Sequence, residues 1–178
     1  DWSSDVCSSD LNDGALDSAV ATVSITITAV NDAPTAVAQS VTTAEDTAKA
    51  ITLAGTDPEG SALTYTIVAA PANGTLSGTG ANRTYTPSAN FNGADSFTFK
   101  VNDGSLDSAI ATVSITVTAV NDAPVAVAQS ISTAEDTAKA VTLAATDVDN
   151  NPLTYVVVTP PAQGTLSGAA PNLIYTPA

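Results

Sequence analysis

Apolar and polar residues alternate with a period of two along most of this chain. In residues 109–119, every second position is Ala, Val or Ile, and Thr or Ser stand between them. The same alternation runs through residues 63–67 and 97–101, and no stretch carries a sustained helical stripe. This period is typical of strands that bury one face and expose the other. The sequence therefore predicts an all-β protein.

Turn signals such as Asn73-Gly74, Asn92-Gly93 and Asp103-Gly104 separate the alternating runs. Together they predict strands near residues 35–43, 48–56, 62–69, 75–77, 83–87, 95–101 and 109–119. Seven short strands in about ninety residues predict a two-sheet antiparallel sandwich of immunoglobulin-like type.

The core of this sandwich has to form without a disulfide or a tryptophan. Tyr65, Phe97 and Phe99 lie in alternating runs and are the predicted large core residues. Tyr85 and Phe91 lie in irregular sequence, and we place them inside as well. Burial of each aromatic contributes about 1.5–3 kcal/mol, so Phe99→Ala is expected to threaten a marginally stable domain.

The chain repeats itself at an offset of 90 residues. Residues 12–88 and 102–178 share 53 identities in 77 positions, and Val-Asn-Asp-Ala-Pro occurs at 30–34 and again at 120–124. We call these two pentapeptides the upstream joint and the downstream joint. The repeat predicts the last strand of a truncated module in 12–33, a complete module in 34–123, and a truncated third module in 124–178.

The third module lacks the equivalents of strands 95–101 and 109–119. One of its sheets therefore cannot close, and its open edges are expected to favour association or partial disorder. The strand in residues 12–33 cannot complete it alone, because the sixth strand would still be missing.

Residues 1–11, DWSSDVCSSDL, lie outside the repeat. They match the translation of a common sequencing adaptor, and we interpret them as a cloning or assembly remnant. The alternative is a natural tail rich in Ser and Asp. The only Trp and the only Cys of the chain, Trp2 and Cys7, fall in this segment.

The chain is strongly acidic, with 18 Asp and Glu residues, four basic residues and a formal net charge of −14. Nucleic-acid binding needs clustered Lys and Arg, so this class of partner is excluded. No apolar run approaches the ~20 residues that span a bilayer. Without His, and without Cys outside residues 1–11, imidazole or thiol catalysis and Cys/His zinc sites are excluded as well. A carboxylate pair alone remains for catalysis, but the acids repeat with the module, so no enzyme is predicted.

The acidic residues collect at the ends of the predicted modules. An up-and-down strand order brings together, at the downstream joint, Glu45, Asp46, Asp95, Asn121, Asp122, Asp147 and Asp149. At the upstream joint it gathers Asn31, Asp32, Asp57, Glu59 and Asp103. Two carboxylates ~5 Å apart repel by about 3 kcal/mol at an effective dielectric of ~20. A cation relieves this repulsion, and Ca²⁺ suits flexible carboxylate and carbonyl ligands.

Other roles remain open for some of these acids. Turn Asp and Asn residues often accept hydrogen bonds from their own backbone, and this role is the favoured one for Asp103 and Asp107. Asp95 has an equal alternative as the anchor at the start of its strand. Lys49 and Lys139, four residues after each Glu, are alternative partners that would neutralise part of the charge.

Several motifs recur in a fixed order after Leu11. They are Asn-Asp-Ala-Pro at both joints, Ala44-Glu-Asp-Thr47, Asp57-Pro-Glu-Gly60, Leu63-Thr-Tyr65, Pro71-Ala-Asn-Gly-Thr-Leu76, Tyr85-Thr-Pro87, Phe91-Asn-Gly-Ala-Asp-Ser-Phe97 and Val101-Asn-Asp-Gly104. As a set they resemble the cadherin-like and immunoglobulin-like tandem repeats of giant bacterial surface and secreted proteins. The resemblance implies an extracellular or cell-surface, adhesin-like protein.

The resemblance also implies ligands for calcium. In cadherins, a Glu near the first strand, the Asp/Asn joint and a following Asp-x-Asp share ions between domains. The counterparts in this chain are Glu45 and Glu135, Asn31-Asp32 and Asn121-Asp122, and Asp147-Val-Asp149. The chain departs from the cadherin pattern where Asp57-Pro-Glu59 replaces Asp-x-Asp. It also lacks the Leu-Asp-Arg-Glu motif, for which only Asp95 stands in a comparable place.

These observations predict a structural spacer whose joints bind calcium and whose partners are the neighbouring repeats. A last strand of eleven residues gives a module about 36 Å long. The alternative functions are an adhesion module that binds a carbohydrate or another cell-surface or matrix ligand, and an accessory repeat beside a catalytic domain.

Overall fold

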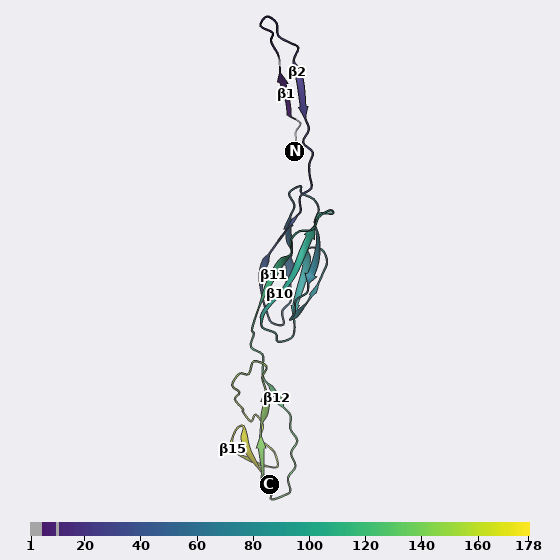
Figure 1. Cartoon of the computed structure of the whole chain (residues 1–178). Coiled ribbons are helices and arrows are strands. Elements are labelled where there is room, and N and C mark those ends of the chain that lie inside the picture. Colours follow the sequence, from purple (N-terminus) through teal and green to yellow (C-terminus); the bar gives the residue numbers. More distant parts are fainter. Residues whose placement is uncertain (1–4, 10) are drawn as a thin grey trace.

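The computed structural model describes residues 5–9 and 11–178, and every regular element in this part of the chain is a strand. Three parts follow one another along the long axis of the molecule (Figure 1). The first is a hairpin of β1 (Asp5–Ser9) and β2 (Ala21–Ile25). Residues 1–4 and 10 of the segment attributed to an adaptor lie outside the described residues.

The second part, residues 34–123, is a two-sheet sandwich. Its strands are β3 (Thr35–Val37), β4 (Gln39–Ala44), β5 (Lys49–Thr52), β6 (Ala54–Thr56), β7 (Thr64–Ala69), β8 (Gly74–Ser77), β9 (Asn82–Pro87), β10 (Gly93–Asn102) and β11 (Ala111–Thr118). One sheet has the order β4-β11-β10-β7, the other β5-β9-β8, and β3 pairs with β6. The all-β, immunoglobulin-like fold predicted from the alternation is confirmed.

Two of the predicted strands are each divided in two. The run 35–43 is interrupted at Ala38, so that β3 pairs antiparallel with β6 while β4 pairs parallel with β11. The run 48–56 is interrupted at Leu53, whose N–H bonds to the carbonyl of Ala81. The sandwich is therefore not antiparallel throughout. The first strand changes sheets, and after the change it runs beside the last strand in the same direction.

The core lies between the two sheets of this part. Along β11, the alternate residues Ala111, Val113, Ile115 and Val117 are buried and the residues between them are exposed. Of the predicted aromatic core, Phe97, Phe99 and Tyr85 are at most 1% exposed. Tyr65 and Phe91 are partly buried and pack against the same core, and the rings of Tyr65 and Phe99 stack with centroids 6.5 Å apart.

The third part, residues 124–178, has only half of this sandwich. Its strands are β12 (Val125–Val127), β13 (Lys139–Thr142), β14 (Ala144–Thr146), β15 (Gly164–Ala169) and β16 (Asn172–Pro177). The pair β12-β14 and the sheet β13-β16-β15 repeat β3-β6 and β5-β9-β8. Residues 129–134 and 154–159, the counterparts of β4 and β7, form no strand. In the sandwich, β4 and β7 pair only with β11 and β10, which have no counterpart in residues 124–178.

Candidate metal centres at the joints

The upstream joint packs against the sandwich that follows it through two side-chain contacts. The amide of Asn31 donates to Asp103 Oδ2 at 2.8 Å and to the carbonyl of Asp32 at 3.3 Å. The backbone N–H of Asp32 donates to Glu59 Oε2 at 3.3 Å. Four residues predicted for this joint are thereby brought together.

Asp57, the fifth residue predicted for the upstream joint, holds the turn that positions Glu59. Its Oδ1 accepts the N–H groups of Glu59 at 3.1 Å and of Ser61 at 2.8 Å. Its Oδ2 is buried and has no hydrogen-bond partner among the described residues. Asp57 therefore keeps one carboxylate oxygen available inside the joint.

The downstream joint repeats the upstream contact with the next module. The backbone N–H of Asp122 donates to Asp149 Oδ2 at 2.7 Å. Positions 122 and 149 are the counterparts of 32 and 59, so the same bond occurs at both joints. The amide of Asn121 donates to the carbonyl of Asp122 at 3.1 Å, as Asn31 does to Asp32.

Asn151 adds a contact at the downstream joint that the sequence did not single out. Its amide donates to Asn121 Oδ1, and its backbone N–H donates to Asp147 Oδ1 at 3.0 Å. Asn151 directly follows the Asp147–Asn150 turn, and this position was the available signal.

The preceding sandwich reaches the downstream joint through Glu45. The side chain is 4% exposed, and its Oε1 accepts the N–H of Val120 at 2.5 Å. The backbone N–H of Glu45 bonds to the carbonyl of Thr118 at 2.9 Å, which extends the pairing of β4 with β11. Its counterpart Glu135 is exposed, because no last strand lies beside it.

Asp46 lies beside Glu45 in a left-handed turn with φ of 54°. Its Oδ1 accepts the N–H of Asn90 at 3.1 Å. Asn90, also at positive φ, was not predicted from the sequence, and its place between two strands gave little signal.

Asp122 is the centre of the acidic cluster at the downstream joint. Burial raises the pKa of its carboxyl, and the charges of Asp149, Asp46, Glu45 and Asp147 raise it further. Its Oδ2 is buried without a hydrogen-bond partner in the described part of the chain. Carboxylates from both neighbouring modules therefore act on one side chain, as the strand order predicts.

A surface cavity of about 470 Å³ lies at this joint, lined by Asn90, Asp122, Ala123, Val125, Thr146, Asp147 and Val148. Within residues 5–9 and 11–178, no three acidic side chains lie close enough to hold one metal ion. Glu45, Asp147 and Asp149 each accept a backbone N–H instead. The acids therefore surround Asp122 without converging on a common point.

Asp95 lies apart from this cluster and has the strand-anchoring role that was its alternative. Its Oδ1 accepts the N–H groups of Ala72 and Ser96, and its Oδ2 accepts the N–H of Asn73 and the hydroxyl of Tyr85. Burial raises the pKa of the Asp95 carboxyl, but these four hydrogen bonds outweigh burial and hold the pKa below its usual value. All four lone pairs face donors, so none is directed at an ion at the joint.

The hairpin acids cap their turns, as their favoured interpretation predicts. Asp103 Oδ1 accepts the N–H groups of Ser105 at 2.6 Å and Leu106 at 2.7 Å, while its other oxygen bonds Asn31. Asp107 bonds Lys100 Nζ at 2.5 Å and the amide of Asn102 at 3.0 Å. Asp103 therefore contributes both to its own hairpin and to the upstream joint.

No helix among the described residues is long and apolar enough to cross a membrane.

Known structures resemble this chain in fold. The extracellular domain of protocadherin gamma B4 is 21% identical over 92% of this chain and 32% of its own length, with a TM-score of 0.51. Cadherin domains 1–4 of protocadherin gamma B7 are 18% identical over 89% of this chain and 44% of their own, with a TM-score of 0.48. An endo-fucoidan hydrolase of glycoside hydrolase family 107 is 21% identical over 99% of this chain and 30% of its own, with a TM-score of 0.43. This chain spans less than half the length of each.

Curated proteins give no match. The model of a protein family, described as a bacterial Ig domain, matches residues 31–116 and again residues 121–178. The two matches follow the 90-residue repeat and cover most of the chain. The chain therefore belongs to the bacterial Ig domain family, as a tandem repeat with a cadherin-like fold.

Proposed function

We propose that this chain is a spacer segment of a large bacterial surface or secreted adhesin-like protein, and that calcium at the joints stiffens the connection between modules. The observation that carries the proposal is the bond from Asp122 N–H to Asp149, which repeats the bond from Asp32 N–H to Glu59. A joint that is fixed in the same way at each repeat gives a chain of defined direction and reach. The family consists of non-catalytic modules, which supports a structural role.

The calcium part of the proposal rests on the surroundings of Asp122. Its buried Oδ2 has no partner within the described residues, and four carboxylates from two modules raise its pKa. A divalent cation would remove this repulsion. Ca²⁺ takes six to eight oxygen ligands, and extracellular sites bind with dissociation constants of roughly 10⁻⁴–10⁻³ M. Glu45, Asp46, Asn121, Asp147 and Asp149 would supply the remaining oxygens after side-chain rotation.

The upstream joint would bind calcium more weakly. Asp57, Glu59, Asn31 and Asp32 are present there, and Asp57 Oδ2 has no partner in the described part of the chain. However, residues 5–33 bring no counterpart of Glu45 or Asp46 to this joint, and Asp32 is exposed whereas Asp122 is half-buried.

A calcium titration of the full chain tests the proposal. Millimolar calcium is expected to raise the thermal midpoint and to lengthen and stiffen the molecule in solution scattering, relative to a chelator. Magnesium at the same concentration controls for screening of the net charge, and Asp17→Asn controls for loss of one carboxylate away from the downstream joint. Equal midpoints and scattering curves in calcium and chelator would remove calcium from the proposal and leave the spacer role.

The neighbouring repeats are the partners that this function requires. A carbohydrate-binding role has less support, because all aromatic side chains of residues 34–123 lie in the core or pack against it. Sugar platforms generally use exposed aromatic faces.

A further inference from the structure

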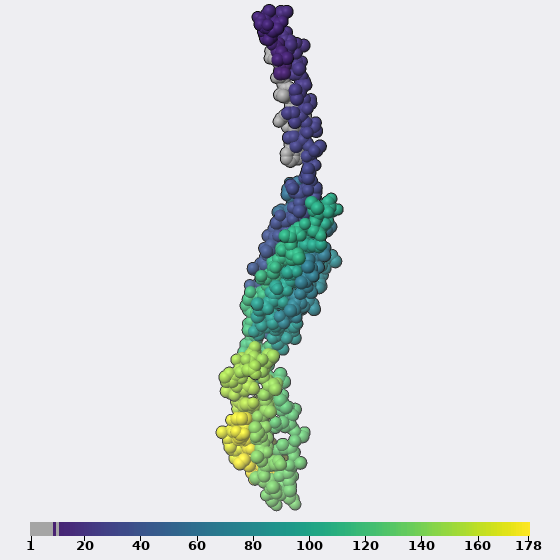
Figure 2. All heavy atoms as spheres, in the orientation of Figure 1, coloured from purple at the N-terminus to yellow at the C-terminus, as the bar shows by residue number. Residues whose placement is uncertain are grey.

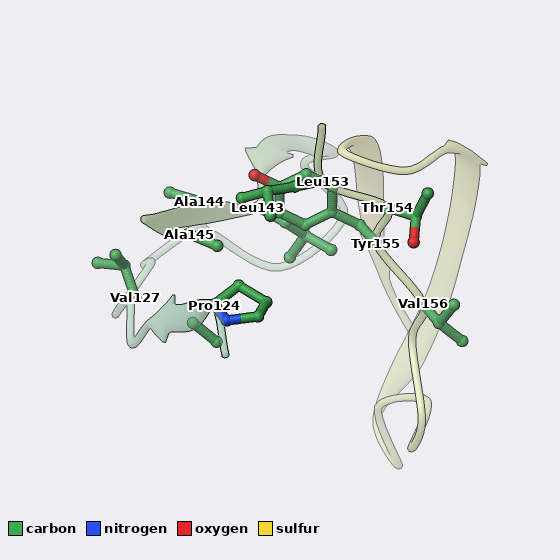
Figure 3. Close-up of a pocket in the computed structure, with 10 residues that line it drawn as sticks. Pro124, Val127, Leu143, Ala144, Ala145, Leu153, Thr154, Tyr155 and Val156 are labelled. Carbon is green, nitrogen blue, oxygen red and sulfur yellow. The ribbon is translucent and has the colours of Figure 1, made fainter. Parts of the chain in front are cut away.

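Residues 124–178 leave an apolar groove where the second sheet of the sandwich would lie. One cavity of about 350 Å³ is lined by Leu143, Leu153, Tyr155 and neighbouring residues, whose side chains Figure 3 shows around it. A second cavity of about 590 Å³ is lined by Ile131, Val141, Leu166 and Tyr175, among others. The space-filling view shows openings in this part of the molecule that the sandwich does not have (Figure 2). Apolar surface on this scale is typical of an interaction site.

The sandwich shows which structure fits this groove. There, the counterparts of the groove residues pack against β10 and β11; Leu53, for example, is 2% exposed. Residues 129–134 differ from β4 only by conservative changes, and β4 is the strand that pairs in parallel with β11. The groove therefore matches a strand with the sequence of β11.

The chain carries such a strand at its other end. Residues 21–28, ATVSITIT, differ from residues 111–118, ATVSITVT, only at position 27. In β11, Ile115 and Val117 are 1% and 3% exposed, whereas their counterparts Ile25 and Ile27 are 50% and 55% exposed. The apolar face of this segment thus lies in solvent although its sequence is that of a core strand.

The neighbouring strand β1 occupies the place that β10 has in the sandwich. Ser9 pairs with Ala21 as Phe99 pairs with Ala111, and Asp5 pairs with Ile25 as Asp95 pairs with Ile115. The hairpin thus offers both strand positions that residues 124–178 lack. β1 has Cys7 and Ser9 where β10 has phenylalanines, so β2 supplies most of the apolar side chains.

We propose that the occupant of the groove is a second copy of this chain, whose β2 pairs in parallel with residues 129–134 in the register of β11 with β4. This register puts Ile25 opposite Ile131 and Thr26 opposite Ser132. Glu135, now exposed, would accept the N–H of Val30 as Glu45 accepts that of Val120. The hairpin and the groove lie at opposite ends of the molecule (Figure 1), so one copy cannot fill its own groove.

The contact is heterologous, because each copy uses a different surface. Every added copy leaves one hairpin and one groove open, so growth gives head-to-tail chains rather than closed dimers. Each contact would rebuild one sandwich from residues 124–178 of one copy and residues 5–33 of the next.

Disulfide trapping tests the register. In a Cys7→Ser background, the Thr26→Cys and Ser132→Cys variants are mixed under mild oxidation, and a linked pair containing both variants is expected. Thr26→Cys with Ser130→Cys, two positions out of register, is expected to link much less. No mixed product, or equal linking in both mixtures, would overturn the proposal. Linking of Ser132→Cys with itself would show that the groove pairs with another groove instead.

Sedimentation under reducing conditions tests the association itself. The average mass of the wild-type chain is expected to rise with concentration, Ile25→Asp to lose this rise, and Thr26→Asp to retain it. Thr26→Asp introduces the same charge one residue away, on the face that is exposed in β11. The thermal midpoint of the sandwich checks that both variants are folded. A wild-type mass that is independent of concentration, or an Ile25→Asp variant that associates like wild type, would contradict the proposal.

Discussion

The hydroxyl of Tyr85 donates a 2.9 Å hydrogen bond to Asp95 Oδ2, and this bond joins the two sheets of the sandwich. Tyr85 belongs to β9 in one sheet, and Asp95 belongs to β10 in the other. Both partners are buried, and Asp95 also holds the backbone of the turn at residues 72–73. In a core without a disulfide, this pair fixes how the sheets face each other.

Tyr85→Phe is expected to lower the free energy of unfolding of the sandwich by about 1.5–3 kcal/mol, since a hydrogen bond to a buried charged group is lost. Urea unfolding measures this change. Tyr175→Phe is the matched control: the hydroxyl of Tyr175 bonds the carbonyl of Gln163 in the third part of the chain, away from any carboxylate partner in the described residues. The main unfolding transition of this control should not move.

Asp95 should make the sandwich sensitive to acid. Its pKa in the folded state is lowered, so its contribution is present above the ordinary Asp pKa and is lost as the pH falls through the folded-state value. Asp95→Asn is expected to be less stable than wild type at neutral pH, with a difference that shrinks on acidification. A difference independent of pH would contradict this role.

Tyr85 predicts a matching loss of stability in alkali. Burial, together with the bond to Asp95 and its charge, raises the pKa of Tyr85 to about 12. A raised pKa means that the contribution of the phenol is fully present below its ordinary pKa of about 10 and is lost as the pH rises through the folded-state value. Midpoints of wild type and Tyr85→Phe should therefore approach each other in this range.

Asp122 should behave in the opposite way to Asp95. Without a cation, its raised pKa means that the folded joint binds a proton more tightly than the unfolded chain, so acidification stabilises the joint. Asp122→Asn is expected to raise stability in chelator at neutral pH and to abolish the response to calcium. A variant that keeps the full calcium response would place the ion elsewhere.

Glu45 and Glu135 provide a comparison within one chain. Glu45→Ala removes a buried acceptor from the N–H of Val120 and is expected to cost about 1–3 kcal/mol. Glu135→Ala, at the exposed counterpart, is expected to change the free energy of unfolding by less than about 0.5 kcal/mol. Thermal unfolding of both variants in chelator, at dilution, gives the comparison.

Phe99→Ala is expected to cost about 3–5 kcal/mol, because the fully buried ring leaves a cavity. Thr98→Ala, the neighbouring position on the other face of β10, is the control and should cost less than about 1 kcal/mol. Denaturant midpoints decide whether the alternation along β10 separates core from surface as strongly as its burial pattern indicates.

Alternation with a period of two was sufficient to locate the strands of residues 34–123, because their burial depends on local register. It could not reveal that β4 pairs in parallel with β11, since pairing direction depends on the path of the whole chain. Residues 129–134 and 154–159 make the same point: they have the pattern of β4 and β7 but form strands only where β11 and β10 lie beside them.

The acids show a similar division. The strand order placed Glu45, Asp122, Asp147 and Asp149 at one joint, because it depends only on which end of a strand each residue occupies. The role of Asp95 depends on the hydroxyl of Tyr85 and on two turn amides, none of which has a signal in the spacing of the acids.

The parallel pairing of β4 with β11 has a mechanical consequence. The chain enters the sandwich before β4 and leaves it after β11, with Gln39 beside Val113 and Ala44 beside Thr118. Tension along the chain therefore pulls these two strands past each other in shear. Their hydrogen bonds carry the load together and do not open one at a time, so the sandwich resists stretching most strongly between its own two ends.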